Sequence, residues 1–160
     1  MPSEKRRKDV TVRDEALNAR LRATLQRRVL PEIAKAHQFA ATHIERYLIG
    51  CYAAEDGAHF GAHRDNITKG TAHRKFAVSI NLNDDFEGGE VFFPEYGERG
   101  FKPAAGGAVV FSCSLLHAVK PMRSGRRYAF LPFLYDDEGA RIREQNITFV
   151  QRGAPVRADV

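Results

Sequence analysis

The chain has 160 residues, of which 43% are hydrophobic and 28% are charged, so one domain with a single core is expected. No apolar run approaches the roughly 20 residues of a membrane helix, and the basic N-terminus is not followed by the apolar core of a secretory signal. Cys51 and Cys113 form neither a CxxC pair nor a framework spacing. They predict free thiols, no disulfide and a reducing, cytoplasmic location.

The formal net charge of +5 is confined to one part of the sequence. Residues 1–28 contain nine basic and four acidic side chains, whereas residues 29–160 contain sixteen of each. A role in nucleic-acid binding would therefore depend on this N-terminal basic arm, because the rest of the chain has balanced charge. We expect neither a nucleic-acid partner nor a membrane partner.

Residues 13–44 carry apolar side chains at steps of three and four residues, which is the spacing of one helical face. Pro31 is predicted to split this stretch into two helices or to bend it. A further short helix is predicted at residues 136–146. The apolar positions of the first stretch are Leu17, Leu21, Leu25, Val29, Ile33 and Ala36.

After residue 44 the chain changes to short runs rich in Val, Ile, Phe and Tyr, separated by turns that contain Gly, Asn and Asp. Eight such runs without intervening helices predict a mainly β fold, a double-sheet jelly roll. We expect one domain made of arm and supporting helices (1–45), a catalytic core (46–135) and a C-terminal helix and tail (136–160). The runs are 46–53, 59–65, 75–83, 90–93, 99–102, 107–112, 115–120 and 127–135.

A candidate metal site begins with the segment His63-Arg64-Asp65 at the end of a predicted strand. Side chains alternate along a strand, so His63 and Asp65 are expected on the same face. His117 follows 52 residues after Asp65, at the end of the apolar run VVFSCSLLH, and can supply a third ligand. Two histidines and one carboxylate form the facial triad of non-haem iron(II) oxygenases, which leaves three coordination positions open.

Arg127 is the candidate anion-binding residue. It lies ten residues after His117 on the next predicted strand, so a hairpin would return it towards the metal. A guanidinium can bind a carboxylate through two parallel hydrogen bonds, which suits the far carboxylate of 2-oxoglutarate. Its neighbour Arg126 should point to the opposite face and form a surface ion pair.

The motifs resemble the prolyl 4-hydroxylase-like branch of the iron(II)- and 2-oxoglutarate-dependent dioxygenases. The resemblance covers roughly residues 46–135 and lies in three segments that occur in the family's order. That resemblance implies a distorted double-stranded β-helix of eight strands with supporting helices, which agrees with the independent strand count. The segments are CYAAEDGAHFGAHRDN, FAVSINLNDDFEGGEVFFPEYG and GGAVVFSCSLLHAVKPMRSGRRYAFLPFLY.

Carried over by position, the resemblance implies that His63, Asp65 and His117 bind Fe(II) and that Arg127 binds 2-oxoglutarate. Tyr52 resembles a hydrogen-bond donor to the co-substrate, and half-buried packing is the other interpretation of this residue. The implied reaction consumes O2, releases succinate and carbon dioxide, and hydroxylates a protein residue such as proline or a small molecule. Ascorbate is a candidate additional cofactor.

Asn81 precedes a Leu-Asn pair at a position that often lines the co-substrate pocket in related enzymes. It shares a strand face with Ser79, so either residue is expected to touch the co-substrate. The polar stretch at residues 66–71 is a candidate flexible lid. The basic cluster that follows, which includes His73 and Arg74, is interpreted as a solvated loop, with contact to an anionic substrate as the alternative.

Two other classes of protein remain as alternatives. The first is a cupin-like metal-binding module or isomerase without oxygenase activity, in which the metal acts only as a Lewis acid. Arg127 argues against it, since such a protein has no use for a dicarboxylate clamp. The second is a nucleic-acid repair oxygenase, which the basic arm favours and the balanced charge of residues 29–160 disfavours.

Overall fold

The structure, a computed structural model, describes residues 4–150. Strands form two main sheets and a short ribbon. The first sheet contains Lys5–Arg6 (β1), His59–His63 (β5), Val91–Phe92 (β8), Gly100–Phe101 (β9) and His117–Val119 (β11). The second contains Lys8–Thr11 (β2), His43–Glu45 (β3), Leu48–Ala53 (β4), Phe76–Asn81 (β6), Ala108–Ser112 (β10), Arg126–Phe130 (β13) and Phe133–Tyr135 (β14). The ribbon pairs Glu87–Gly88 (β7) with Met122–Ser124 (β12).

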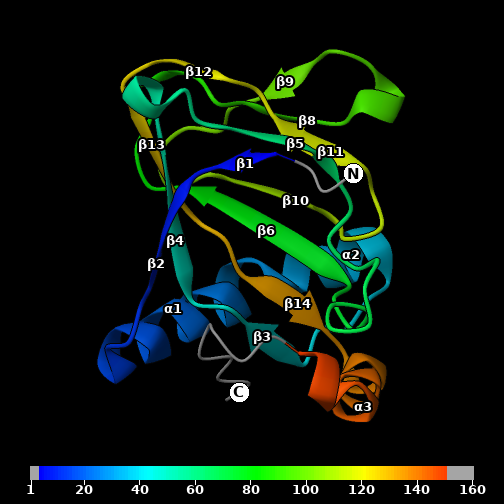
Figure 1. Cartoon of the computed structure of the whole chain (residues 1–160). Helices are drawn as coiled ribbons and strands as arrows, with labels where there is room; N and C mark the ends of the chain where they lie inside the picture. Colours follow the sequence, from blue (N-terminus) through cyan, green and yellow to red (C-terminus); the bar gives the residue numbers. More distant parts are fainter. Residues whose placement is uncertain (1–3, 151–160) are drawn as a thin grey trace.

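The two sheets lie on either side of a central gap, and the helices lie beyond the second sheet (Figure 1). The strand order is β1-β5-β11-β8-β9 in the first sheet and β2-β4-β13-β6-β14-β3 in the second, where β10 also pairs with β6. Every pairing is antiparallel among the residues described. The predicted mainly β jelly roll is confirmed.

The predicted division of the helical stretch is also found. The helices are Glu15–Arg28 (α1), Leu30–His37 (α2) and Asp137–Gln145 (α3), with short 3-10 helices at Ala54–Asp56 (η1), Pro94–Tyr96 (η2) and Ile147–Phe149 (η3). Pro31 lies in the first turn of α2, where its missing N–H costs no helical hydrogen bond. Asp14 caps α1, since its side chain accepts a hydrogen bond from the Leu17 N–H at 2.7 Å.

Several boundaries differ from the expectation. The run predicted at 127–135 is two strands, because Pro132 has no N–H to donate to a sheet ladder. The helical stretch does not extend to residue 44: α2 ends at Gln38 in the left-handed conformation, and β3 begins at His43 and pairs with β14.

The N-terminal arm is not a separate appendage where the structure describes it. β1 pairs with β5 in the first sheet and β2 pairs with β4 in the second, so residues 5–11 cross from one sheet to the other. Only Arg7 separates the two strands. The arm therefore forms part of the β core.

Two clusters of buried residues lie on opposite sides of the second sheet. The helix-backed core packs Leu25 of α1 and Ile33 of α2 with Tyr47 and the strand residues Ile44, Phe76, Val78, Phe130 and Leu134. The inter-sheet core includes Tyr52, Ala77, Val91, Phe111, Cys113, Val119 and Phe133. In the part of the chain described, no helix has both the length and the apolar character needed to cross a membrane.

Candidate active site

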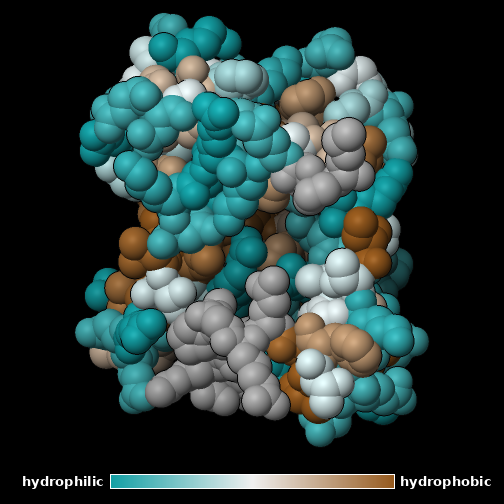
Figure 2. Space-filling model, in the orientation of Figure 1, coloured by the Kyte–Doolittle hydropathy of each residue, from teal (hydrophilic) through white to brown (hydrophobic). Residues whose placement is uncertain are grey.

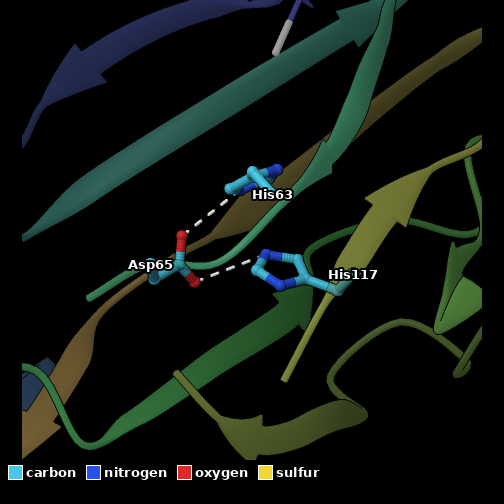
Figure 3. Close-up of side chains that lie close together, drawn as sticks. All are labelled: His63, Asp65 and His117. Carbon is cyan, nitrogen blue, oxygen red and sulfur yellow. Dashed lines mark ion pairs between the residues drawn. The ribbon is translucent and has the colours of Figure 1, made fainter. Parts of the chain in front are cut away.

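Strand pairing brings the three predicted metal ligands together. His63 ends β5, His117 begins β11, and the two residues are directly paired across the first sheet. Their ring centroids are 4.2 Å apart. Asp65 follows β5, where its N–H donates to the Cys113 carbonyl at 3.0 Å. One ligand atom from each of the three residues lies within 4.8 Å of the others, and the side chains converge (Figure 3).

The hydrogen bonds of the two histidines show which ring nitrogen faces the centre of this cluster. His63 Nδ1 lies 2.7 Å from the Gly61 carbonyl, and His117 Nδ1 lies 3.0 Å from the Leu115 carbonyl. Carbonyl oxygens only accept, so each neutral ring carries its proton on Nδ1 and has a lone pair on Nε2. Each Nε2 lies 3.3 Å from an oxygen of Asp65. Lone pairs that converge in this way fit a bound cation.

Electrostatics favour the deprotonated forms that a metal requires. Burial on its own would raise the pKa of Asp65, but the adjacent His63, His117 and Arg46 bring that pKa below its ordinary value. Burial lowers the pKa of His117, against the opposing charge of Asp65. A carboxylate and neutral imidazoles are the forms that coordinate metal ions.

Arg127 points into the space between the sheets and is only 3% exposed. Its Nε donates to Asn81 Oδ1 at 2.9 Å, and one terminal nitrogen donates to Ser79 Oγ at 2.6 Å. Burial lowers the pKa of Arg127. Among residues 4–150 it has no carboxylate partner, although buried charges are normally paired. Arg126 points outward and pairs with Glu55, so the predicted alternation is confirmed.

Tyr52 is paired with Arg127 across β4 and β13 and is 1% exposed. The Arg127 guanidinium carbon lies 5.2 Å from the centre of the Tyr52 ring. Arg7 donates to the Tyr52 hydroxyl at 3.1 Å. The hydroxyl oxygen accepts this bond, so its own proton is available to an acceptor in the cavity.

Arg7 was not among the predicted site residues. It enters from the crossing between β1 and β2 and is held by Asp9, with 3.1 Å between Nη2 and Oδ2. Gly50 makes room for it: a Cβ at position 50 would lie 2.7 Å from Arg7 Cδ. Nothing in the sequence singles out Arg7 from the other basic residues of the arm, because its position depends on long-range strand pairing.

One pocket is lined by the three candidate ligands together with Arg127, Tyr52 and Arg7. On the face shown in Figure 2, the molecule is hollowed between its upper and lower halves, and hydrophobic residues are visible within the hollow. The predicted metal ligands, Arg127 and apolar side chains from both sheets together form the walls of the pocket. Its lining includes Arg7, Arg46, Tyr52, Phe60, His63, Asp65, Ser79, Phe111, His117, Arg127, Leu131 and Phe133.

Asn81, His73 and the candidate lid are placed differently from the expectation. Ser79 lines the pocket and Asn81 does not: Asn81 lies behind Arg127 and is bonded to its guanidinium. His73 is not in a solvated loop, because it is 1% exposed and bonded to Glu45 at 2.8 Å. Within the candidate lid, Gly70 packs so closely on the Phe149 carbonyl that a Cβ would lie 2.3 Å from it.

The family is shown by a match to the model of the 2OG-Fe(II) oxygenase superfamily over residues 42–135. The chain belongs to this superfamily. Its name specifies iron(II) and 2-oxoglutarate, and the donor set described above fits both: a cluster of two imidazoles and a carboxylate for the metal, and an unpaired buried guanidinium for a dicarboxylate.

Curated relatives give the same family, and solved structures share its fold. A PKHD-type hydroxylase of Synechococcus sp. (strain JA-2-3B'a(2-13)) is 31% identical over 67% of this chain and 48% of the relative, and one of Thioalkalivibrio sulfidiphilus is 31% identical over 69% and 53%. The chain thus spans about half the length of these relatives. A prolyl-4-hydroxylase of Pseudomonas putida has a similar fold, with a TM-score of 0.61, 20% identity and coverage of 84% of this chain and 73% of that one.

Proposed function

We propose that the protein is an iron(II)- and 2-oxoglutarate-dependent dioxygenase that hydroxylates its substrate. One observation carries the proposal: the His63, Asp65 and His117 cluster shares a pocket with Arg127, a buried guanidinium that has no carboxylate partner among the described residues. A metal-binding module of the cupin type would need the cluster but not the guanidinium. The two features together therefore favour the oxygenase.

In this proposal the chain's own residues have separate tasks. His63, Asp65 and His117 hold the metal on one face and leave the other face open to the pocket. Arg127 binds the far carboxylate of 2-oxoglutarate, and Tyr52 donates its hydroxyl proton to the same co-substrate. Asn81 and Ser79 fix the guanidinium in position, so that little conformational freedom is lost on binding.

The bound iron would supply oxygen activation, with 2-oxoglutarate converted to succinate and carbon dioxide, one oxygen atom entering succinate and the other entering the hydroxylated substrate. The protein orients the co-substrate and limits access of water to the pocket. Phe60, Phe111 and Phe133 contribute apolar surface to its walls. Exclusion of water strengthens the charge interactions of Arg127 with a bound carboxylate.

For the substrate we propose a protein residue, with proline as the first candidate, or a small molecule. The relatives are named hydroxylases, and a structurally similar prolyl hydroxylase of Trichoplax adhaerens, with a TM-score of 0.66 and 19% identity, was determined with a peptide of hypoxia inducible factor. We also propose a cytoplasmic location, supported by two free thiols, Cys51 and Cys113. Ascorbate is proposed as a reductant that sustains turnover.

Anaerobic titration of the iron(II)-loaded protein with 2-oxoglutarate tests this function. We expect a weak visible charge-transfer band on binding, and succinate when oxygen is admitted. Zinc-loaded protein is the control, because it should bind 2-oxoglutarate without the band. Absence of both the band and succinate from the iron protein would refute the proposal and favour the metal-binding module.

A further inference from the structure

A second cation, which is only partly buried, lines the same pocket. Arg46 lies in the turn between β3 and β4, and its Nε donates to the Leu131 carbonyl at 3.4 Å. Its two terminal NH2 groups have no hydrogen-bond or ion-pair partner within residues 4–150. Neither group is fully buried, and the residue lines the pocket. Arg46 therefore presents free donors to whatever occupies the pocket.

The backbone at Arg46 is held in an unfavourable conformation. Its φ is +70°, and Gln38 is the only other described non-glycine residue with a positive φ. Gln38 ends helix α2, which is a common place for this conformation, whereas Arg46 ends no helix. Left-handed backbone costs an L-residue roughly 1–2 kcal/mol, and such strain is concentrated at functional sites.

The guanidinium is held in place by an aromatic ring and not by a counter-charge. Its central carbon lies 4.4 Å from the centre of the Phe133 ring, and that of Arg74 lies 4.1 Å from the same ring. Stacking on an aromatic ring orients a guanidinium but leaves its charge unneutralised. Burial and the nearby charge of Arg74 lower the pKa of Arg46 to about 10, so the group is still a cation at neutral pH.

Arg46 and Arg127 line the pocket from different elements, the turn between β3 and β4 and strand β13. The charge of Arg7 acts on both guanidinium groups, and the charge of Asp65, a proposed metal ligand, also acts on that of Arg46. Arg7 is neutralised by Asp9, and the proposed function gives Arg127 the far carboxylate of 2-oxoglutarate. Within residues 4–150, Arg46 is then the remaining arginine of the pocket without a carboxylate partner, and it lines the same pocket as the metal cluster.

We propose that Arg46 is a substrate-binding residue, and that the substrate carries a carboxylate close to the carbon that is hydroxylated. This inference rests on the proposed function. A planar carboxylate matches the two free terminal nitrogens of Arg46, and binding there would place the carbon atoms next to the carboxylate beside the metal cluster. The carboxylate belongs to a small organic or amino acid, or to an acidic group of a protein.

Carboxylate binding can be measured without turnover. Zinc-loaded protein saturated with 2-oxoglutarate is titrated with trifluoroacetate, and binding is followed by fluorine NMR; trifluoroacetamide is the neutral probe. We expect trifluoroacetate to bind while 2-oxoglutarate stays bound, and the amide to bind at least about tenfold more weakly, because it cannot form charge-assisted hydrogen bonds.

Three variants assign the site. Arg46→Gln should weaken trifluoroacetate binding about tenfold or more, Arg46→Lys should retain part of it, and Arg126→Gln, which removes an exposed arginine, should change nothing. The affinity for 2-oxoglutarate should be equal in all three. The melting temperature of Arg46→Gln should stay close to that of the wild type, because the terminal nitrogens have no partner within residues 4–150 to lose; a structural arginine would give a lower one.

Outcomes of other kinds are equally informative. Equal binding of acid and amide, displacement of 2-oxoglutarate by trifluoroacetate, or unchanged binding in Arg46→Gln would overturn the inference. Failure of 2-oxoglutarate to bind, with trifluoroacetate binding still dependent on Arg46, would refute the proposed function and leave the anion site in place.

The source of the carboxylate is decided with the iron enzyme. Succinate formation is compared between free small acids and amino acids on one side and end-capped peptides with one acidic residue on the other. Amide counterparts serve as controls in both sets, and amides that are turned over as well as the acids would contradict the proposal.

Discussion

Buried charges occur in two regions of this molecule, and they are satisfied in opposite ways. At the edge of the second sheet, Glu45 is 1% exposed and is shared by His73 at 2.8 Å and Arg74 at 2.7 Å, with Arg143 at 3.7 Å. In the pocket between the sheets, the buried Arg127 and the partly buried Arg46 have no carboxylate partner among the described residues. Removing one partner of a buried ion pair destabilises the fold, whereas we propose that the arginines without a carboxylate partner bind a ligand.

The largest effect should come from the metal cluster. His63→Ala, Asp65→Ala or His117→Ala should each abolish iron-dependent succinate formation, with a loss of more than about 100-fold, since a missing ligand should cost more than a missing outer hydrogen-bond partner. The proteins should remain folded, because the cluster serves an open site. Asp65→Glu should also be inactive, as one added methylene displaces the carboxylate.

Circular dichroism and metal analysis are the accompanying measurements for these variants. Succinate formation retained in all three alanine variants would remove the metal assignment. Near wild-type activity of Asp65→Glu would count against direct ligation by Asp65.

The paired charge provides the contrast in stability. Glu45→Gln should lower the free energy of unfolding by about 3 kcal/mol at pH 7, because the substitution leaves buried cations without their counter-charge. Glu32→Gln, which breaks an exposed ion pair with Lys35, should cost under about 1 kcal/mol. Chemical denaturation measures both values.

The pH dependence of this difference has a definite sign. Burial opposes the charge of Glu45, but His73 and Arg74 bring its pKa below the ordinary 4.5. A lowered folded-state pKa gives stability that is complete above pH 4.5 and is lost as pH falls through the folded-state value. The difference in free energy of unfolding between wild type and Glu45→Gln should therefore be constant from pH 7 to pH 5.5 and should become smaller in acid. A difference that becomes larger in acid would contradict the pairing of Glu45 with His73 and Arg74.

Arg127 should affect co-substrate binding and not metal binding. A charge-assisted hydrogen bond to a buried carboxylate is worth roughly 1.5 to 3 kcal/mol, so Arg127→Ala should raise the dissociation constant for 2-oxoglutarate on the order of tenfold to a hundredfold. Iron affinity measured without co-substrate should barely change. Arg126→Ala is the matched control, because its side chain lies on the outer face of the same strand. If Arg126→Ala raised the dissociation constant for 2-oxoglutarate and Arg127→Ala did not, the carboxylate-binding residue would have to be reassigned.

Much of this site follows from strand alternation alone. The alternation of side chains along a strand predicted that His63 and Asp65 share a face and that Ser79 and Asn81 lie together. It also predicted that Arg127 points inward and Arg126 outward. Arg46 lies within the run predicted at 46–53 but in the turn before β4, where its left-handed backbone interrupts the alternation, so this pattern does not place it.

Other features depend on contacts between distant segments. β7 and β12 are two and three residues long and have too short a pattern to detect. β1 and β2 contain mostly charged residues, so hydrophobic periodicity does not reveal them. Arg7 reaches Tyr52 only because these strands pair with β5 and β4.

The smallest effect should come from Tyr52, whose hydroxyl accepts a hydrogen bond from Arg7 and is proposed to donate one to 2-oxoglutarate. Tyr52→Phe keeps the ring that packs against Arg127 and removes only the hydroxyl, so it should cost about 1 kcal/mol, or roughly fivefold in 2-oxoglutarate affinity. Tyr128→Phe, on the exposed face of β13, is the control and should leave the affinity unchanged. If Tyr52→Phe lowered thermal stability but left 2-oxoglutarate affinity equal to that of the control, Tyr52 would be a packing residue that anchors Arg7, and the proposed bond to the co-substrate would be wrong.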